Sequence, residues 1–122
     1  MESQTTVDDL LCQISAAIEV DPVSTYDLRA GNGWGAGLER WIPEHMRAGV
    51  ARYVLLGTPP GQFLRAIIEG DFFEACRRAD DVNGAALRNY ALFLHNYAPG
   101  GCFGSADHLA DWVEVGGIIG LE

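Results

Sequence analysis

The chain has 122 residues, 48% of them apolar and 20% charged, which fits one compact globular domain rather than a disordered segment. Seventeen acidic residues stand against eight arginines and no lysine, and the net charge is −9. The missing lysine excludes phosphate-loop and Schiff-base chemistry, and the net charge disfavours direct binding to double-stranded DNA.

Hydrophobic periodicity predicts a first helix over residues 7–20, where apolar side chains recur every three or four positions. Asp21-Pro22 ends it, because a residue before proline avoids helical geometry. Residues 21–40 are then predicted to form a long connection with a weak hint of extended structure at residues 20–26. Its last part carries glycine at every second position over residues 31–37.

This glycine-rich loop does not have the G-x-G-x-x-G spacing of a dinucleotide-binding turn, and no strand precedes it. A flexible connection is therefore preferred over a phosphate cradle. Trp34 lies inside the loop, where a tryptophan either folds back onto the core or contacts a partner.

Five further helices are predicted near residues 43–56, 59–69, 72–79, 82–98 and 105–115. Glycines 57, 70 and 116 end three of them, and Asp71, Asp80 or Asp81, and Ser105 cap others. We expect Phe72, Cys76 and Ala79 on the buried side of the short fourth helix.

The predicted fold is an all-α, compact, single-domain bundle of about six short helices. Residues 1–40 give the first helix and the connection, residues 41–117 the helical core, and residues 118–122 an apolar tail.

Reactive side chains do not form a recognisable catalytic set. His95, Cys102 and His108 could in principle hold a metal, or Cys102 could pair with His95 as a nucleophile, but their spacing matches no zinc or nucleophile motif. His45 and His108 are expected on the surface. We predict no catalytic residue, no metal and no cofactor.

The cellular compartment of the protein can be predicted from its cysteines and from the length of its apolar segments. Cys12, Cys76 and Cys102 are few and lack C-x-x-C spacing, which indicates reduced thiols. Acids occupy the first residues, where a signal peptide would be positive, and no apolar run approaches the ~20 residues that span a bilayer. The sequence predicts a cytoplasmic protein with no membrane partner.

Charge is unevenly distributed and suggests two alternative binding surfaces. Residues 1–39 carry a net charge of −6, whereas residues 40–65 carry +3. The first alternative is a partner-binding acidic surface with an aromatic anchor, made of Asp8, Asp9, Glu19, Asp21, Asp27 and Trp34. The second is a nucleic-acid or protein contact face of arginines, made of Arg40, Arg47, Arg52 and Arg65, with Arg40 and Arg47 projecting from one side of the second helix region.

A series of motifs accompanies the helices from residue 41 to residue 117. It includes Pro43-Glu-His45-Met46, Gly57-Thr-Pro59-Pro60-Gly61-Gln-Phe63-Leu64, Phe93-Leu94-His-Asn96-Tyr97-Ala98-Pro99, Cys102-Phe-Gly104-Ser105, Trp112 and Gly116-Gly117. The series resembles an uncharacterised family of short proteins encoded by phages and prophages, and residues 1–40 lie outside the resemblance. It brings no catalytic residue and no cofactor.

The resemblance implies a biological setting. Small acidic phage proteins of this kind resemble inhibitors of host defence, of which anti-CRISPR proteins are one class. We therefore expect a non-enzymatic inhibitor in the host cytosol that binds a basic, nucleic-acid-handling defence complex stoichiometrically and blocks it. The alternative is a small helical regulatory module that binds nucleic acid, or transcription or replication proteins, through its arginine face.

Overall fold

The computed structural model describes the backbone of residues 2–122 and the side chains of residues 7–122, and this part of the chain is helical with no strand. The all-α prediction is confirmed, but the described residues form ten α-helices instead of about six. The first helix begins at Glu2 rather than near residue 7, and most of the later helices are shorter than expected. The α-helices are α1 (Glu2–Val20), α2 (Pro22–Ala30), α3 (Gly35–Trp41), α4 (Glu44–Leu56), α5 (Gln62–Glu69), α6 (Phe72–Arg78), α7 (Asp81–Ala85), α8 (Leu87–Tyr97), α9 (Ala106–Val115) and α10 (Gly117–Leu121), with a 3₁₀ helix η1 at Gly100–Cys102.

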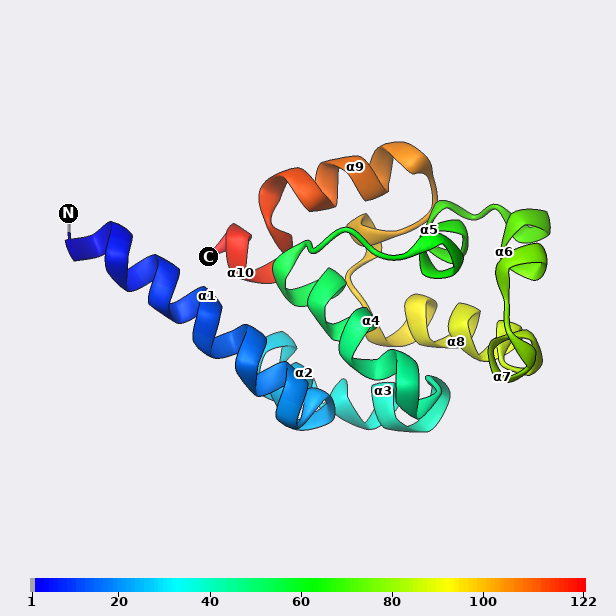
Figure 1. The fold of residues 1–122 in the computed structure, drawn as a ribbon, viewed down its shortest axis with the longest axis horizontal. Coiled ribbons are helices and arrows are strands. Elements are labelled where there is room, and N and C mark those ends of the chain that lie inside the picture. Colours follow the sequence, from blue (N-terminus) through cyan, green and yellow to red (C-terminus); the bar gives the residue numbers. More distant parts are fainter. Residues whose placement is uncertain (1) are drawn as a thin grey trace.

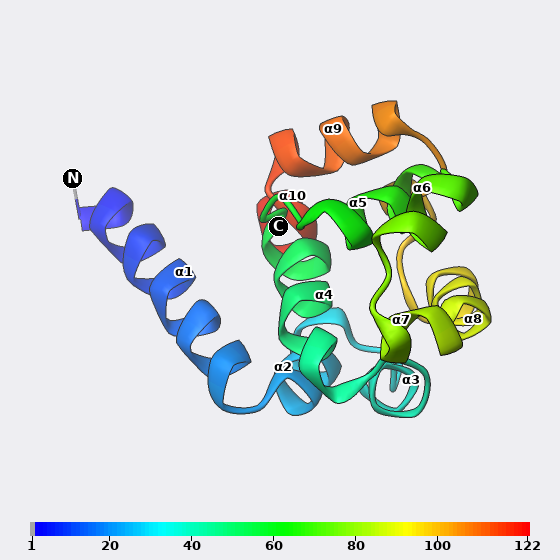
Figure 2. The same cartoon turned by 45° about the vertical axis from the view of Figure 1, so that its right-hand side comes forward.

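Helix α4 runs through the body of the molecule, with α2 and α10 packed against it, while α3 packs on α8 and α5 on α9 (Figure 1). Helix α1 meets the body at its C-terminal end, through α2 and α4, and its N-terminal half projects as an arm (Figures 1 and 2). The largest fully buried side chains form one core: Tyr26, Tyr53, Tyr90, Phe93, Ile14, Ile18, Leu38, Ile42, Leu55, Ile68, Val54 and Cys102.

Three buried tyrosine hydroxyls connect elements that are distant in sequence. The Tyr26 hydroxyl donates to the backbone carbonyl of Tyr97, and the Tyr53 hydroxyl to that of Cys102. Tyr90 donates to the side-chain carbonyl of Asn83. Burial raises the pKa of all three tyrosines, so each stays a neutral donor at physiological pH.

The predicted connection over residues 21–40 is wrong, because two helices occupy most of it. The Asp21 carboxylate accepts a hydrogen bond from the backbone N–H of Ser24, and Pro22 begins α2. Proline is favourable at the first position of a helix, so the pair that ends α1 also begins α2. The loop is short: Gly31, Asn32 and Gly33 adopt positive φ, and α3 begins at Gly35.

Two further boundaries differ from expectation. The predicted helix over residues 82–98 divides at Ala86 into α7 and α8, where the buried Asn83 side chain binds Tyr90 instead of facing solvent. Asparagine and glycine at positions 83 and 84 also weaken helix continuity. The predicted tail 118–122 falls within and just after α10, which buries Ile119.

Local capping signals are confirmed at five helices. Asp71, Asp80 and Ser105 each accept a backbone N–H at the start of α6, α7 and α9. Glycines 57, 70 and 116 end α4, α5 and α9 in the left-handed conformation.

The buried face predicted for residues 72–79 is wrong for Phe72 and Cys76, whereas Ala79, just after α6, is partly buried against the core. Phe72 is 63% exposed and Cys76 is exposed, while Ala75 is the buried residue of α6. A helix of seven residues that packs mainly on α5 can bury one small side chain without burying its aromatic residues. This leaves two phenylalanines at the surface.

Candidate functional site

The five predicted acidic contact residues do not form one continuous free surface. Asp8 and Asp9 are exposed on the α1 arm. Glu19 forms an ion pair with Arg52 on α4. Asp21 caps α2, and its hydrogen bonds with Ser24 lower the pKa of its carboxyl group. Asp27 accepts a hydrogen bond from the backbone N–H of Gly35 at 3.0 Å, which holds α3 beside α2.

Two of these acids line a hollow that sequence reasoning did not identify. Glu19 and Asp21 at the α1–α2 junction face a cavity of about 510 Å³ whose other wall comes from α3 and α4. That wall adds Glu39 and Glu44, so four carboxylates gather around the hollow. We call this set, Glu19, Asp21, Glu39 and Glu44, the acidic hollow. Glu39 and Glu44 lie on either side of the link between α3 and α4, so the sequence gives no signal that they face α1.

One arginine, Arg47, also lines the acidic hollow, and the backbone already uses its guanidinium. Its Nε donates to the carbonyl of Ile42 at 2.9 Å, and its Nη2 donates to the carbonyl of Glu39 at 2.7 Å. Arg47 therefore fixes the α3–α4 corner without forming an ion pair with the carboxylates. The hollow keeps an excess of negative charge, and it can accept a basic side chain from outside.

The predicted arginine face is largely occupied by internal contacts. Arg40 lies on α3, with its guanidinium 4.7 Å from the centre of the Trp41 ring, whereas Arg47 and Arg52 lie on α4. Arg40 and Arg47 therefore do not share one helix, contrary to expectation. Arg52 pairs with Glu19, and Arg65 pairs with Glu69 at 2.9 Å. Arg47, Arg52 and Arg65 therefore have hydrogen bonds or ion pairs with which a phosphate would have to compete, whereas Arg40 has only its contact with the Trp41 ring.

Trp34 folds back rather than standing in solvent. It is half-buried and packs against the core just before α3. A part of its ring remains available to a partner, but its truncation would also remove core contacts. Binding and stability effects at Trp34 must therefore be measured separately.

The histidines and the thiol do not gather into a reactive site. Cys102 is completely buried, and burial raises the pKa of its thiol to about 12, opposite to what an activated nucleophile needs. His95 is exposed on α8, while the Nδ1 atom of His108 lies 2.7 Å from the hydroxyl of Ser105. Within the described residues, no three His, Cys, Asp or Glu side chains meet in a metal-binding cluster.

The three thiols are expected to differ in reactivity with Ellman's reagent. Cys12 and Cys76 are exposed, so both should react rapidly in the native protein. Cys102 should react only after unfolding, because it is inaccessible and its pKa is raised. Titrations of the native and the denatured protein, followed by the absorbance of the released dye, should give two and three thiols, respectively. A third rapid thiol in the native state would contradict the burial of Cys102.

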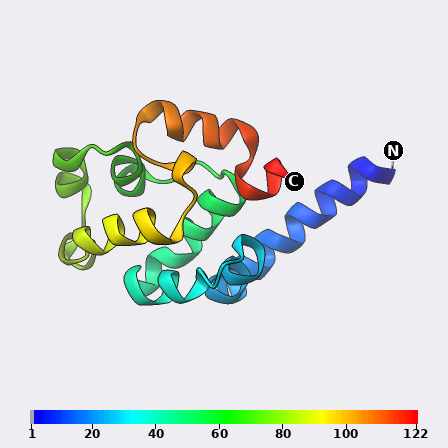
Figure 3. The ribbon, with the colours of Figure 1, turned by 180° about the vertical axis from the view of Figure 1, so that it is seen from behind.

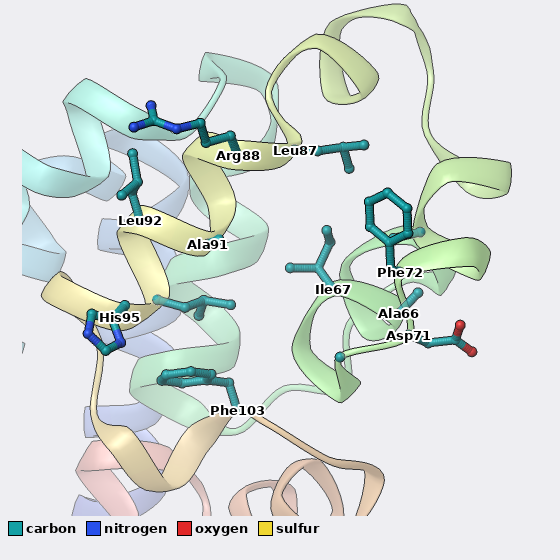
Figure 4. A pocket seen from close by; sticks show the side chains of 13 residues that line it. Ala66, Ile67, Asp71, Phe72, Leu87, Arg88, Ala91, Leu92, His95 and Phe103 are labelled. Atoms are coloured by element: carbon teal, nitrogen blue, oxygen red, sulfur yellow. The ribbon is translucent and has the colours of Figure 1, made fainter.

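A second hollow lies at the other end of the body and is mostly apolar. This groove has a volume of about 820 Å³ and runs between α8 on one side and α5 and α6 on the other (Figure 4). Ile67 and Phe72 lie on the α5–α6 side, Leu87 and Leu92 come from α8, and Phe103 lies at one end. The sequence pattern did not reveal the groove, because it placed Phe72 in the core rather than at the surface.

No protein-family model, curated protein or solved structure matches the chain. Among the described helices, none is both long and apolar enough to cross a bilayer. The features of the chain that bear on function are the acidic hollow, the apolar groove and the net charge of −9.

Proposed function

We propose that the protein is a non-enzymatic, phage- or prophage-encoded inhibitor of host defence, similar in action to anti-CRISPR proteins. It binds a basic, nucleic-acid-handling host complex in fixed stoichiometry and blocks it. The acidic hollow is the observation that carries this proposal, because four carboxylates line one concave place and two of them, those of Glu39 and Glu44, form no ion pair within the described chain. The phage-like motif series from residue 41 to residue 117 supplies the biological setting.

The chemistry of the hollow suits an arginine or lysine of the partner. Surfaces that normally hold nucleic-acid phosphates are rich in these residues, and carboxylates are their preferred protein ligands. Arg47 holds the α3–α4 corner through the carbonyls of Ile42 and Glu39, so the backbone that carries Glu39 and Glu44 is in place before binding. A pre-organised site loses less conformational entropy when the partner arrives.

The net charge of −9 adds a longer-range attraction to a basic partner. Such attraction increases the association rate at low ionic strength and weakens as salt screens it. Asp8 and Asp9 on the projecting arm contribute to this steering. The regulatory-module alternative gains less support, because Arg47, Arg52 and Arg65 already bind groups within the chain.

The test mixes the purified protein with a CRISPR effector complex from the host and follows target-DNA binding as the inhibitor ratio rises. Inhibition should saturate near one protein per complex. The double variant Glu39→Gln/Glu44→Gln should raise the dissociation constant by about tenfold or more, with the largest effect at low salt. Asp8→Asn/Asp9→Asn should mainly slow association.

The matched control is Asp107→Asn/Asp111→Asn on α9, which removes the same charge from exposed positions away from the hollow. Asp107, like Glu44, lies in the first turn of its helix, so the loss of helix-dipole stabilisation is also matched. Equal weakening by both double variants would show that net charge, not the hollow, determines binding. Complete inhibition at ratios far below equimolar would indicate an enzyme and overturn the proposal.

A further inference from the structure

Two apolar surfaces of this chain are left uncovered, and they lie at opposite ends of the molecule. One is the groove between α8 and α5–α6, and the other is the projecting half of α1 (Figures 1 and 3). We propose that the protein self-associates by placing the α1 arm of one copy in the groove of a second copy. This inference concerns the assembly of the protein and does not depend on the proposed function.

The groove is open to an occupant larger than a small molecule. Phe72 lines it and is 63% exposed. Phe73 is 83% exposed and packs edge-to-face on Phe72, with 5.5 Å between the ring centres. The apolar surface thus continues past the cavity onto the outside of α6. A helix laid in the groove can cover both rings, which a ligand confined to the cavity cannot do.

The arm presents the matching convex surface. Ile14 and Ile18 are buried where α1 packs on the body. Val7, Leu10 and Leu11 continue the same helical stripe, because they precede Ile14 by seven, four and three residues. The body does not fully cover this continuation: Val7 is 50% exposed and Leu11 is 39% exposed. Apolar side chains on a projecting helix favour burial against another surface.

The charges of the groove and of the α1 arm are complementary, which makes the arm a suitable occupant of the groove. Arg88 and His95 both line the groove from α8, two helical turns apart, and neither forms an ion pair within the described chain (Figure 4). Asp71 on the facing side is already engaged as the cap of α6. The first 28 residues contain acids and no base. An acidic helix lying along α8 therefore meets the positive charge of Arg88.

The contact between arm and groove must form between two copies of the chain. The groove lies between α8 and α5–α6. The α1 arm leaves the body beside α2 and points away from these helices, so the two do not meet within one molecule (Figures 1 and 3). Reciprocal exchange of two arms between two grooves covers both surfaces in each copy and closes the assembly as a two-fold dimer.

The assembly is tested by sedimentation velocity from low to high micromolar concentration. The wild-type chain of 13.2 kDa should sediment as a dimer that dissociates on dilution. Leu11→Glu on the arm and Ala91→Trp in the groove should each weaken association by about tenfold or more, because truncated or blocked central contacts usually dominate an interface. Gln13→Glu on the exposed side of α1 and Asn96→Trp on α8 outside the groove are the matched controls.

Mixing the two defective variants gives the decisive result. The Ala91→Trp chain retains an intact arm and the Leu11→Glu chain an intact groove, so the mixture should form a one-to-one complex that neither variant forms alone. Arg88→Glu provides a second groove variant should circular dichroism show that Ala91→Trp is misfolded. A monomeric wild-type chain at every concentration would overturn the proposal. So would a dimer that Leu11→Glu disrupts but both groove variants leave intact, since that pattern indicates pairing between arms.

Discussion

Replacing Gly117 with alanine is expected to lower the free energy of unfolding by about 3 kcal/mol or more. Gly117 begins α10 with φ of +70°, a conformation that alanine adopts poorly. An added Cβ would also lie 2.6 Å from the backbone N of Gly57 and from the carbonyl carbon and oxygen of Leu55. These are main-chain atoms of α4 and its end, so relief would require α10 to move away from α4.

Urea unfolding followed by circular dichroism measures this loss, with Gly49→Ala as the control. Gly49 is an exposed position inside α4, where an added Cβ would meet no atom within 4 Å. Alanine there should stabilise the protein by about 0.5–1 kcal/mol, because it favours the helix over glycine. If Gly117→Ala unfolded at the same urea concentration as Gly49→Ala, the close packing of α10 on α4 would be disproved.

The sequence was informative where a structural signal is local. Asp71, Asp80 and Ser105 cap helices with side chains that reach only three residues forward. Gly57, Gly70 and Gly116 end helices through their own φ angles. Such signals need no knowledge of the tertiary structure, so these helix starts and stops were predictable, whereas the division into α7 and α8 and the helix α10 were not.

The acidic hollow and the groove could not be predicted, since each depends on packing between segments. Glu19 and Glu44 are far apart in sequence and share a hollow because α1 and α2 pack beside α4. Phe72 comes directly after the capping residue Asp71 and fits the apolar pattern of a helix. A helix of seven residues is too short, however, for its periodicity to show which face of α6 is buried in the core. Asp21-Pro22 was ambiguous for a different reason, because the same pair ends one helix and begins the next.

The glycines at 31–37 show most clearly how composition misled the prediction. They were interpreted as a source of flexibility, yet only Gly31 and Gly33 among them take positive φ and leave space around them. Gly35 is buried, and a Cβ there would lie 2.5 Å from the Cβ of Asp27. Gly37 is also buried and lies against the ring of Tyr97. These last two glycines allow helices to approach closely.

Gly37→Ala is therefore expected to cost about 3 kcal/mol of unfolding free energy, the upper part of the range for overpacked cores. The added methyl group would overlap the Tyr97 ring where α3 packs on α8. That ring cannot swing out freely, because it stacks on Phe93 and the Tyr97 backbone carbonyl accepts the Tyr26 hydroxyl. Gly33→Asn should have a much smaller effect, since asparagine tolerates the left-handed conformation that Asn32 already adopts.

A double-mutant cycle with Tyr97→Ala separates steric overlap from a general intolerance of substitution in this segment. Removing the ring leaves room for the new methyl group, and alanine then favours helix α3 relative to glycine by about 0.5–1 kcal/mol. In the Tyr97→Ala background, Gly37→Ala should therefore change from strongly destabilising to neutral or stabilising. If the cost stayed the same in both backgrounds, the ring of Tyr97 would not be its cause. If Gly33→Asn and Gly37→Ala lowered the free energy of unfolding by equal amounts, the glycines would serve flexibility. The close packing of α3 on α8 would then be disproved.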